Sequence, residues 1–442
     1  MLTLGLFGSS APALSASDGT QLIVTPESAL FDAPAHIWVR TRAPDALVTL
    51  EARAVIDGTT YRSWASFRTD RSGAVDLAAA APRRGTYAGV DPMGLFWSMQ
   101  VVKNRGYTPA SLDPIRIRMT LFTRSGSRSV IVTRTRIAPD VTRVQLHGGS
   151  IVGTLFLQRE ATAHGVVLVL GGSEGGADES RAAIIASHGF DTLALAYFGM
   201  DGLPAELADI PLEYVERAIT WVRERPQTRN LPLVIEGDSK GAELALLIAA
   251  RDPFVKGVIA LAPSSSTFEG FSTRQGVRRA SWAVSGVPLS YADNPIPAAV
   301  KAQIKADRAA QRAVSFRAQY MALATPPKPE STIAVEKISG PLLLVAGADD
   351  QLWPSDVFAH RILAARRASG VKFTDELLVF PEAGHEIDVP YMPTSDLAVV
   401  DEGSFRLALG GTPAGYARAD ESMWVKVLEF LDRLSAAPPH QP

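Results

Sequence analysis

Cysteine is absent from this chain of 442 residues, which excludes disulfides, thiolate chemistry and zinc–cysteine sites. Long apolar runs are absent as well. None approaches the roughly 20 residues that span a bilayer, so we expect no stable membrane insertion. The formal net charge is only −2, so the charge balance favours no nucleic-acid partner. A chain without cysteine is compatible with either the cytoplasm or an exported protein.

Positive charge is also missing from the first residues, where a secretory signal would carry it. Residues 2–7 are nevertheless mostly apolar, and residues 11–16 are mostly small, in the order that such a signal shows. Two interpretations of residues 1–20 therefore stay open. They are either the remnant of an export signal whose start codon lies farther upstream, or a disordered N-terminus. Localisation stays open between the cytoplasm and export for the same reason.

What the chain does contain is ample apolar sequence for two domains. Apolar residues make up 46% and charged residues 20%, which is ordinary for a soluble globular protein. Residues 21–138 show short alternating patterns, for example over 48–54 and 115–121, with turn signals such as Asp57-Gly58 between them. This spacing predicts an all-β, immunoglobulin-like sandwich domain. No cluster of catalytic residue types occurs in it, so we expect a structural role.

The pattern changes at residue 139, and strands alternate with helices up to residue 435. Strands are predicted at 166–170, 192–196, 233–235, 258–262, 342–345 and 376–380, and helices at 179–187, 212–223 and 422–434. Such alternation predicts a doubly wound, mostly parallel sheet, whose ligands lie at the carboxyl ends of the strands. Residues 263–339 interrupt the pattern as a lid-like excursion with a helix at 298–313. Residues 436–442 are predicted to be a disordered tail.

One Gly-x-Ser-x-Gly motif, from Gly237 to Gly241, stands between a predicted strand and a helix rich in leucine and alanine. A tight turn there forces the central serine into strained backbone angles, and the two glycines leave room for it. The helix N-terminus beneath the serine favours developing negative charge. This arrangement is typical of the nucleophile elbow of an α/β-hydrolase. We therefore predict that Ser239 is a nucleophile.

A serine nucleophile needs a base and a group that orients the base. In α/β-hydrolases these follow the serine in the order acid, then histidine. Of the seven histidines, only His385 follows a strand late in the chain, and we predict it to be the general base. Asp350, which follows the strand 342–345, is predicted to orient it. Asp349 stays the alternative, since spacing does not separate adjacent residues.

A second motif of the same form occurs at residues 171–176, where Ser173 is the central serine. Its strand comes early in the sheet, and a glycine-rich loop at that place supplies one backbone N–H of the oxyanion hole. We predict that the backbone of Ser173 and of Lys240 forms this hole. Ser173 as the nucleophile is the alternative.

Several segments in both halves of the chain carry a resemblance to a known family. They are residues 87–99, 189–190, 194–198, 211–214, 237–244, 347–355, 381–385 and 390–391. Together they resemble the acyl-CoA thioesterase and bile-acid-CoA:amino-acid N-acyltransferase family, over residues 25–434. The resemblance implies a β-sandwich followed by an α/β-hydrolase domain, with Ser239, Asp350 and His385 as the catalytic triad. Serine in place of cysteine at the nucleophile implies hydrolysis. One departure is Ser173-Glu174, where apolar or glycine residues are expected.

The expected function is that of a serine acyl hydrolase of lipid metabolism, which cleaves acyl-CoA thioesters through an acyl-enzyme on Ser239. It requires no metal or cofactor, and its partner is a small-molecule acyl thioester or ester. Arg274, Arg278 and Arg279 are candidates to bind the phosphates of CoA, with a solvated basic turn as the alternative. If the chain is exported, an ester, lactone or amide becomes the expected substrate. A carboxylesterase, an amino-acid N-acyltransferase and a catalytically silent binding protein are the competing hypotheses. The pattern does not specify an oligomeric state.

Overall fold

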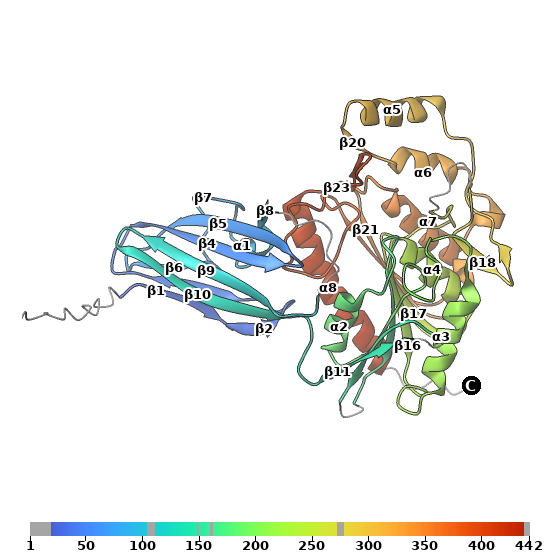
Figure 1. The fold of residues 1–442 in the computed structure, drawn as a ribbon, viewed down its shortest axis with the longest axis horizontal. Helices are drawn as coiled ribbons and strands as arrows, with labels where there is room; N and C mark the ends of the chain where they lie inside the picture. Colours follow the sequence, from blue (N-terminus) through green and yellow to red (C-terminus); the bar gives the residue numbers. More distant parts are fainter. Residues whose placement is uncertain (1–18, 104–110, 148–149, 160–161, 272–277, 437–442) are drawn as a thin grey trace, which may run out of the picture.

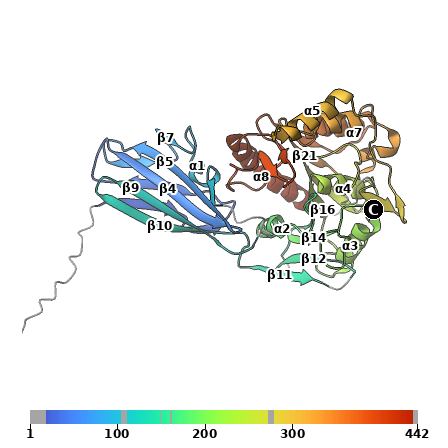
Figure 2. The ribbon, with the colours of Figure 1, turned by 45° about the horizontal axis from the view of Figure 1, so that its top comes forward.

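The computed structural model describes residues 19–103, 111–147, 150–159, 162–271 and 278–436. The predictions for residues 1–18, for the tail 437–442 and for Arg274 lie outside these ranges. The described chain folds into two parts, a β-rich N-terminal part and an α/β C-terminal part, which lie side by side along the long axis of the molecule (Figure 1). They remain distinct in the rotated view of Figure 2. In the ranges that are described, no helix is both long and apolar enough to cross a membrane.

Two packed sheets form the N-terminal part. The smaller has the order β1-β3-β6, and the larger has the order β2-β10-β9-β4-β5-β7, with β8 paired to β5. Their bounds are β1 Gln21–Thr25, β2 Ser28–Leu30, β3 His36–Arg40, β4 Leu47–Ile56, β5 Thr59–Arg68, β6 Ala74–Asp76, β7 Arg84–Gly85, β8 Gln100–Lys103, β9 Ile115–Thr123 and β10 Gly126–Thr135. Buried and exposed residues alternate strictly in β1 and β3, because successive side chains of a strand point to opposite faces. The predicted all-β sandwich is confirmed.

The C-terminal part is built on one eight-stranded sheet. Its order is β11-β12-β14-β13-β16-β17-β21-β22. The bounds are β11 Val141–Leu146, β12 Gly153–Gln158, β13 Val166–Leu170, β14 Asp191–Leu195, β16 Leu233–Asp238, β17 Val255–Leu261, β21 Leu342–Gly347 and β22 Glu376–Phe380. Only β12 runs against its neighbours in this sheet, and the strands from β14 to β22 are parallel. This is the predicted α/β-hydrolase sheet.

Helices cover both faces of that sheet, because its central strands are apolar on both sides. The helices that cover it are α2 Glu179–Ala186, α3 Leu212–Glu224, α4 Lys240–Ala249, α7 Ser355–Ala368 and α8 Pro413–Ala436. Alternate residues of one strand serve different cores. Val167 and Val169 pack in a cluster with α2 and α8, while Leu168 and Leu170 pack in another with α3, α4 and α7.

Two helix predictions differ from the structure. α8 begins at Pro413 rather than at residue 422, because its first turn contains a glycine, which weakens the helical pattern there. A Cβ on that residue, Gly415, would lie 2.0 Å from the carbonyl oxygen of Glu382, so only glycine lets the helix approach the chain there. The helix α5 (Ala298–Ala309) ends before residue 313. Gln311 has a φ of 53°, which turns the chain away from the helix.

The excursion from residue 263 to 339 contains further short elements besides α5. They are β18 Trp282–Val284, β19 Val287–Pro288, β20 Ala313–Val314, α6 Arg317–Leu323, η1 Pro329–Ser331 and η2 Val335–Lys337. β18 pairs with β15 (Ile210–Pro211), and β20 pairs with β24 (Arg406–Ala408), which in turn pairs with β23 (Val399–Asp401). Strand pairing therefore attaches the excursion to the rest of the C-terminal part at two places.

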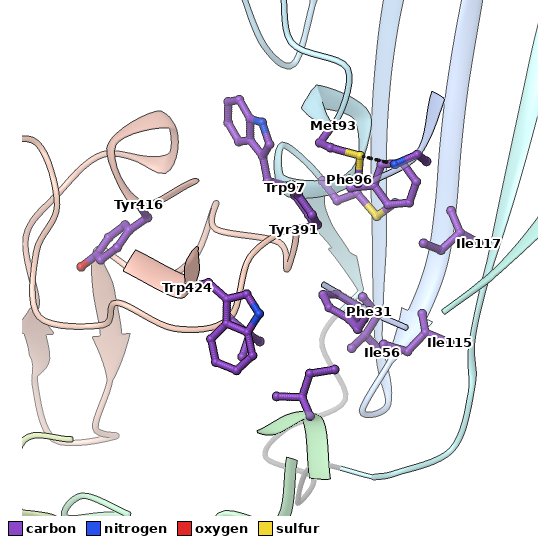
Figure 3. Close-up of a cluster of buried hydrophobic side chains, with 14 of the residues drawn as sticks. Phe31, Ile56, Met93, Phe96, Trp97, Ile115, Ile117, Tyr391, Tyr416 and Trp424 are labelled. Atoms are coloured by element: carbon purple, nitrogen blue, oxygen red, sulfur yellow. Dashed lines mark hydrogen bonds between the residues drawn. The ribbon is translucent and has the colours of Figure 1, made fainter. Parts of the chain in front are cut away.

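The two parts share a continuous apolar core. Trp97 of the short helix α1 (Gly94–Trp97) and Met93, which precedes that helix, lie in one buried cluster with Tyr391 and Trp424 of the C-terminal part (Figure 3). Polar contacts reinforce this interface at its rim. The buried carboxylate of Asp32 accepts hydrogen bonds from Trp424 Nε1 at 2.7 Å and from His188 Nε2 at 2.6 Å.

Candidate active site

The elbow at Ser239 joins the end of β16 to the start of α4. Ser239 has φ 51° and ψ −115°, a backbone conformation that persists only where the surroundings enforce it. A Cβ on Gly237 would lie 2.3 Å from the carbonyl oxygen of Gly241, and one on Gly241 would lie 2.1 Å from that of Leu170. Both glycines of the motif are therefore required by close backbone approach.

Three side chains, each from a segment that follows a strand, meet at this elbow. His385 Nε2 lies 2.8 Å from Ser239 Oγ, and His385 Nδ1 lies 2.9 Å from Asp350 Oδ2. All three residues are buried. The geometry fits the neutral imidazole that carries its proton on Nδ1. The Nδ1–H then donates a hydrogen bond to Asp350, and Nε2 accepts one from the hydroxyl of Ser239. Ser239, Asp350 and His385 follow β16, β21 and β22, so the parallel strands bring them to one edge of the sheet.

The two adjacent aspartates have separate roles in the fold. Asp350 Oδ1 accepts hydrogen bonds from the backbone N–H groups of Leu352 and Trp353, which leaves its Oδ2 for His385. The carboxylate of Asp349 instead accepts hydrogen bonds from Gln351 Nε2 and Gly411 N. The carboxylate that reaches the imidazole is therefore that of Asp350.

Further carboxyl groups lie around Ser239, Asp350 and His385. Partial loss of contact with water raises the pKa of Glu174 to about 7 although the residue as a whole stays exposed, and the charges of Glu386 and Asp178 add to the effect. Burial likewise raises the pKa of Asp238, which precedes Ser239. The main counterion is the buried guanidinium of Arg181. It pairs with Glu236 at 2.9 Å and also with Asp388 and Asp178.

A buried ion pair lies directly beneath the elbow. Lys240 Nζ contacts both carboxylate oxygens of Glu243 at 3.0 Å. Glu243 also accepts from Trp282 Nε1 at 2.6 Å and from Phe268 N at 3.2 Å, both in the excursion. Sequence reasoning used only the backbone of Lys240 and missed this network. The three-residue spacing of Lys240 and Glu243 on a helix was a usable signal.

The other predicted site residues, Ser173, Arg278 and Arg279, lie outside the cluster of Ser239, Asp350 and His385. Ser173 lies in the loop after β13, is exposed, and makes no hydrogen bond to a histidine among the described residues. Arg278 pairs with Glu269 at 2.6 Å, and Arg279 pairs with Asp209 at 2.7 Å. Each of these arginines is therefore already opposed by a carboxylate, and their predicted contact with phosphates stays a prediction.

Nothing within the described ranges gathers three or more histidine, aspartate or glutamate side chains in a way that could hold a metal ion. A cavity of about 840 Å³ lies at the opposite edge of the sheet, lined by Pro232, Lys256, Pro341 and Glu376 among others. These residues are at the starts of strands, whereas the triad follows their ends. The triad is thus separate from that cavity.

Comparisons with known proteins agree with this architecture. Two family descriptions match the chain: "Acyl-CoA thioester hydrolase/BAAT N-terminal region" over residues 32–148 and "BAAT / Acyl-CoA thioester hydrolase C terminal" over residues 210–436. Acyl-coenzyme A thioesterase 6 of Mus musculus is 32% identical over 91% of this chain and 94% of its own length. Acyl-coenzyme A amino acid N-acyltransferase 1 of Mus musculus is 31% identical over 93% of this chain and 97% of its own.

Among solved structures, a dienelactone hydrolase-like phosphotriesterase from metagenomic libraries aligns with a TM-score of 0.40 and 14% identity. The alignment covers 67% of this chain and 99% of that one. The extent and identity of the sequence matches decide the family. The chain belongs to the family of acyl-CoA thioester hydrolases and bile-acid-CoA amino-acid N-acyltransferases.

Proposed function

We propose that this protein hydrolyses acyl-CoA thioesters to the free acid and CoA, through an acyl-enzyme on Ser239. The observation that carries the proposal is the unbroken pair of hydrogen bonds from Asp350 through His385 to Ser239, on a strained elbow. The substrate class is supported by relatives named acyl-coenzyme A thioesterases, about 30% identical over nine-tenths of the chain. The nucleophile is a serine, which favours water as the final acceptor.

In the acylation step, Ser239 Oγ attacks the thioester carbonyl while His385 Nε2 takes the hydroxyl proton. The carbonyl oxygen becomes an oxyanion, which is stabilised by the backbone N–H of Ser173 in the loop after β13 and by that of Lys240 at the start of α4. The carbon–sulfur bond then breaks, and the imidazolium returns its proton to the departing thiolate. The products of this step are an ester on Ser239 and free CoA.

In the deacylation step, His385 Nε2 takes a proton from water, whose oxygen attacks the acyl ester. A second oxyanion forms at the same backbone donors and collapses, with the proton passing to Ser239 Oγ. The acid is released and the serine is restored. Asp350 holds the imidazole in position and stabilises its positive charge during both steps.

Two related activities compete with this proposal. Relatives named acyl-coenzyme A amino acid N-acyltransferases match over 93% of the chain, so an amine could replace water in the second step. A carboxylesterase would use the same side chains with an alcohol as the leaving group. Both alternatives keep Ser239 as the nucleophile. They differ from the proposal only in the leaving group of the first step or in the acyl acceptor of the second.

Product identity separates these activities. Purified protein is incubated with acyl-CoAs of different chain length and with p-nitrophenyl esters, each with and without glycine or taurine, and products are identified by mass spectrometry. We expect free acid and CoA from the thioesters, with no N-acyl amino acid. Ester cleavage without thioester cleavage would overturn the substrate class, and N-acyl products would overturn hydrolysis.

Two serine variants identify the nucleophile. Ser239→Ala is expected to lower kcat by about 10⁴- to 10⁶-fold and to abolish labelling by a fluorophosphonate. Ser173→Ala, which keeps the backbone N–H, is the matched control and should retain activity. Activity that survives in Ser239→Ala and not in Ser173→Ala would reverse the assignment, and a wild-type protein without labelling or turnover would favour the silent binding protein.

A further inference from the structure

The glycine-rich loop after β13 is held from one side by a single buried tyrosine. The hydroxyl of Tyr197, which follows β14, lies 2.6 Å from the carbonyl oxygen of Gly171 and 3.0 Å from that of Gly172. Burial, together with the charges of Glu174, Asp238 and Glu243, raises the pKa of Tyr197 well above its ordinary value. The hydroxyl therefore stays protonated and can donate. Both carbonyl groups point to the side of the loop on which Tyr197 lies.

This orientation fixes the direction of two N–H groups. In a trans peptide the C=O and N–H of one unit point in opposite directions. The unit that contains Gly171 O also contains Gly172 N, and the unit that contains Gly172 O also contains Ser173 N. Both N–H groups therefore face away from Tyr197.

A carboxylate already occupies the first of these N–H groups. Gly172 N donates to Glu174 Oε1 at 2.9 Å, so Glu174 holds the loop from the side opposite Tyr197. The Ser173 N–H has no acceptor among the hydrogen bonds of the described residues. Of the two N–H groups on this side of the loop, the one belonging to Ser173 is therefore available to a substrate.

The loop passes directly beside the nucleophile. A Cβ on Gly172 would lie 3.4 Å from Ser239 Cβ, 2.8 Å from Asp238 Oδ2 and 2.9 Å from Glu174 Oε2. Two residues beyond Ser239 in the elbow, a Cβ on Gly241 would lie 2.5 Å from the carbonyl oxygen of Gly171. The loop and the elbow are thus in backbone contact, and a peptide that flipped in the loop would present a carbonyl where an oxyanion must form.

We infer that Tyr197 and Glu174 are positioning residues for the oxyanion hole, which clamp the loop from opposite sides so that the Ser173 N–H is aimed at the reacting carbonyl. The loop needs such a clamp because glycines at 171, 172, 175 and 176 leave its peptide units free to rotate. The inference rests on the proposed function, since it requires Ser239 to be the nucleophile. It explains why an acid stands at residue 174, where the family resemblance leads us to expect an apolar residue or glycine.

The charges around Glu174 are compatible with this role. Asp238 faces it from the nucleophile strand, Glu386 from the chain after the catalytic histidine, and Asp178 from the start of α2. Partial loss of contact with water, together with the charges of Glu386 and Asp178, brings the pKa of Glu174 to about 7. A carboxyl that is partly protonated at neutral pH repels a nearby oxyanion less than a fully ionised one.

The central test is Tyr197→Phe, which removes only the hydroxyl and keeps the ring packed on Phe198 and Trp282. Loss of one oxyanion donor lowers kcat by about 10²- to 10³-fold, so we expect a decrease of about 10²-fold with KM within about twofold of wild type. Affinity for a trifluoromethyl ketone, which forms a tetrahedral adduct with the serine, should fall by the same factor. Affinity for a non-hydrolysable acyl-CoA thioether should not change.

Tyr214→Phe is the matched control. Tyr214 is also buried, and its hydroxyl also bonds backbone groups, accepting from Val152 N and donating to the Ala196 carbonyl oxygen, both at 2.9 Å. It makes none of its hydrogen bonds to the glycine-rich loop, so its loss should lower stability while kcat and the affinity for the ketone stay within about twofold. Equal losses of kcat in both tyrosine variants would mean a general structural effect and would overturn the inference.

Two further variants test the opposite side of the clamp. Glu174→Gln keeps an oxygen that can accept from Gly172 N, and its kcat should stay within about threefold of wild type. Glu174→Ala removes that acceptor and should lose about 10-fold. If Ser239→Ala abolishes turnover while Tyr197→Phe has wild-type kcat and ketone affinity, the clamp is wrong and the proposed function stands. If Ser239→Ala keeps full activity, the proposed function itself fails.

Discussion

At the scale of single residues, the proposed reaction depends on the protonation state of His385. Burial of the ring lowers its pKa. The charge and hydrogen bond of Asp350, with the charges of Glu386 and Glu174, outweigh that effect and leave the pKa above the ordinary 6.5. The imidazole accepts the serine proton only when it is neutral. Because the pKa is raised, the inactive imidazolium form of His385 persists to higher pH.

The pH profile of kcat/KM tests this directly. We expect activity to rise with pH and the midpoint of this acidic limb to lie above 6.5, because the folded protein favours the protonated ring. Asp350→Asn removes the charge behind the ring and should lower kcat by about 10⁴-fold. The acidic limb of its residual activity should move to lower pH. A wild-type midpoint below 6.5 would contradict the prediction.

At the scale of elements, the first turn of α4 is buried and contains an ion pair between Lys240 and Glu243. The Lys240 ammonium has almost no contact with water and depends on Glu243, while Glu243 also holds the excursion through Trp282 and Phe268. Burial lowers the pKa of Lys240 and raises that of Glu243, and their mutual attraction opposes both shifts. The pair thus ties the start of the helix to the base of the excursion.

Breaking one half of this pair should be strongly destabilising. Glu243→Ala leaves the ammonium buried and unpaired, and we expect a loss of about 3–5 kcal/mol in the free energy of unfolding, measured in urea. Lys240→Met combined with Glu243→Leu replaces both charges and should recover most of that loss. Glu216→Ala, which breaks the half-exposed pair with Arg251, should cost less than about 1 kcal/mol. Equal effects of Glu243→Ala and Glu216→Ala would show that burial of the pair is unimportant.

At the scale of the whole molecule, the sandwich supports the chain that follows His385. Thr394 N donates to the Trp97 carbonyl oxygen at 3.0 Å, and Ser395 Oγ donates to that of Met99 at 2.7 Å. The apolar core runs through the same interface (Figure 3). The two parts are therefore expected to unfold together.

Asp32 offers a test of that coupling, since its carboxylate serves two donors of the other part. Asp32→Ala leaves the buried Trp424 Nε1 without its acceptor and should lower the free energy of unfolding by about 1–3 kcal/mol. Glu429→Ala, which removes an exposed pair with Lys426 on α8, should change it by less than about 0.5 kcal/mol. A separate unfolding transition for the sandwich in the wild-type protein would contradict the coupling.

Much of this architecture follows from local patterns. Residues 233–247 specify a strand, a strained turn and a helix within fifteen positions, because β-branched residues, glycines and small helix formers each restrict the backbone nearby. The order of strands and helices after residue 139 likewise predicted the parallel sheet, which is confirmed. The predicted start of α8 was wrong by nine residues, because Gly415 is required by contact with a distant segment rather than by the helix itself.

Contacts between distant segments decided the rest. Asp349 and Asp350 are equivalent by spacing, and the packing of Gly411 and Gln351 against the first leaves the second facing His385. Tyr197 lies 26 residues from the carbonyl that it holds, and nothing in its neighbourhood along the chain reveals that contact. Backbone conformation depends on neighbours in sequence, so composition and periodicity could specify the elements. The direction of each side chain at the site depends on what packs against it from elsewhere, which only the folded chain contains.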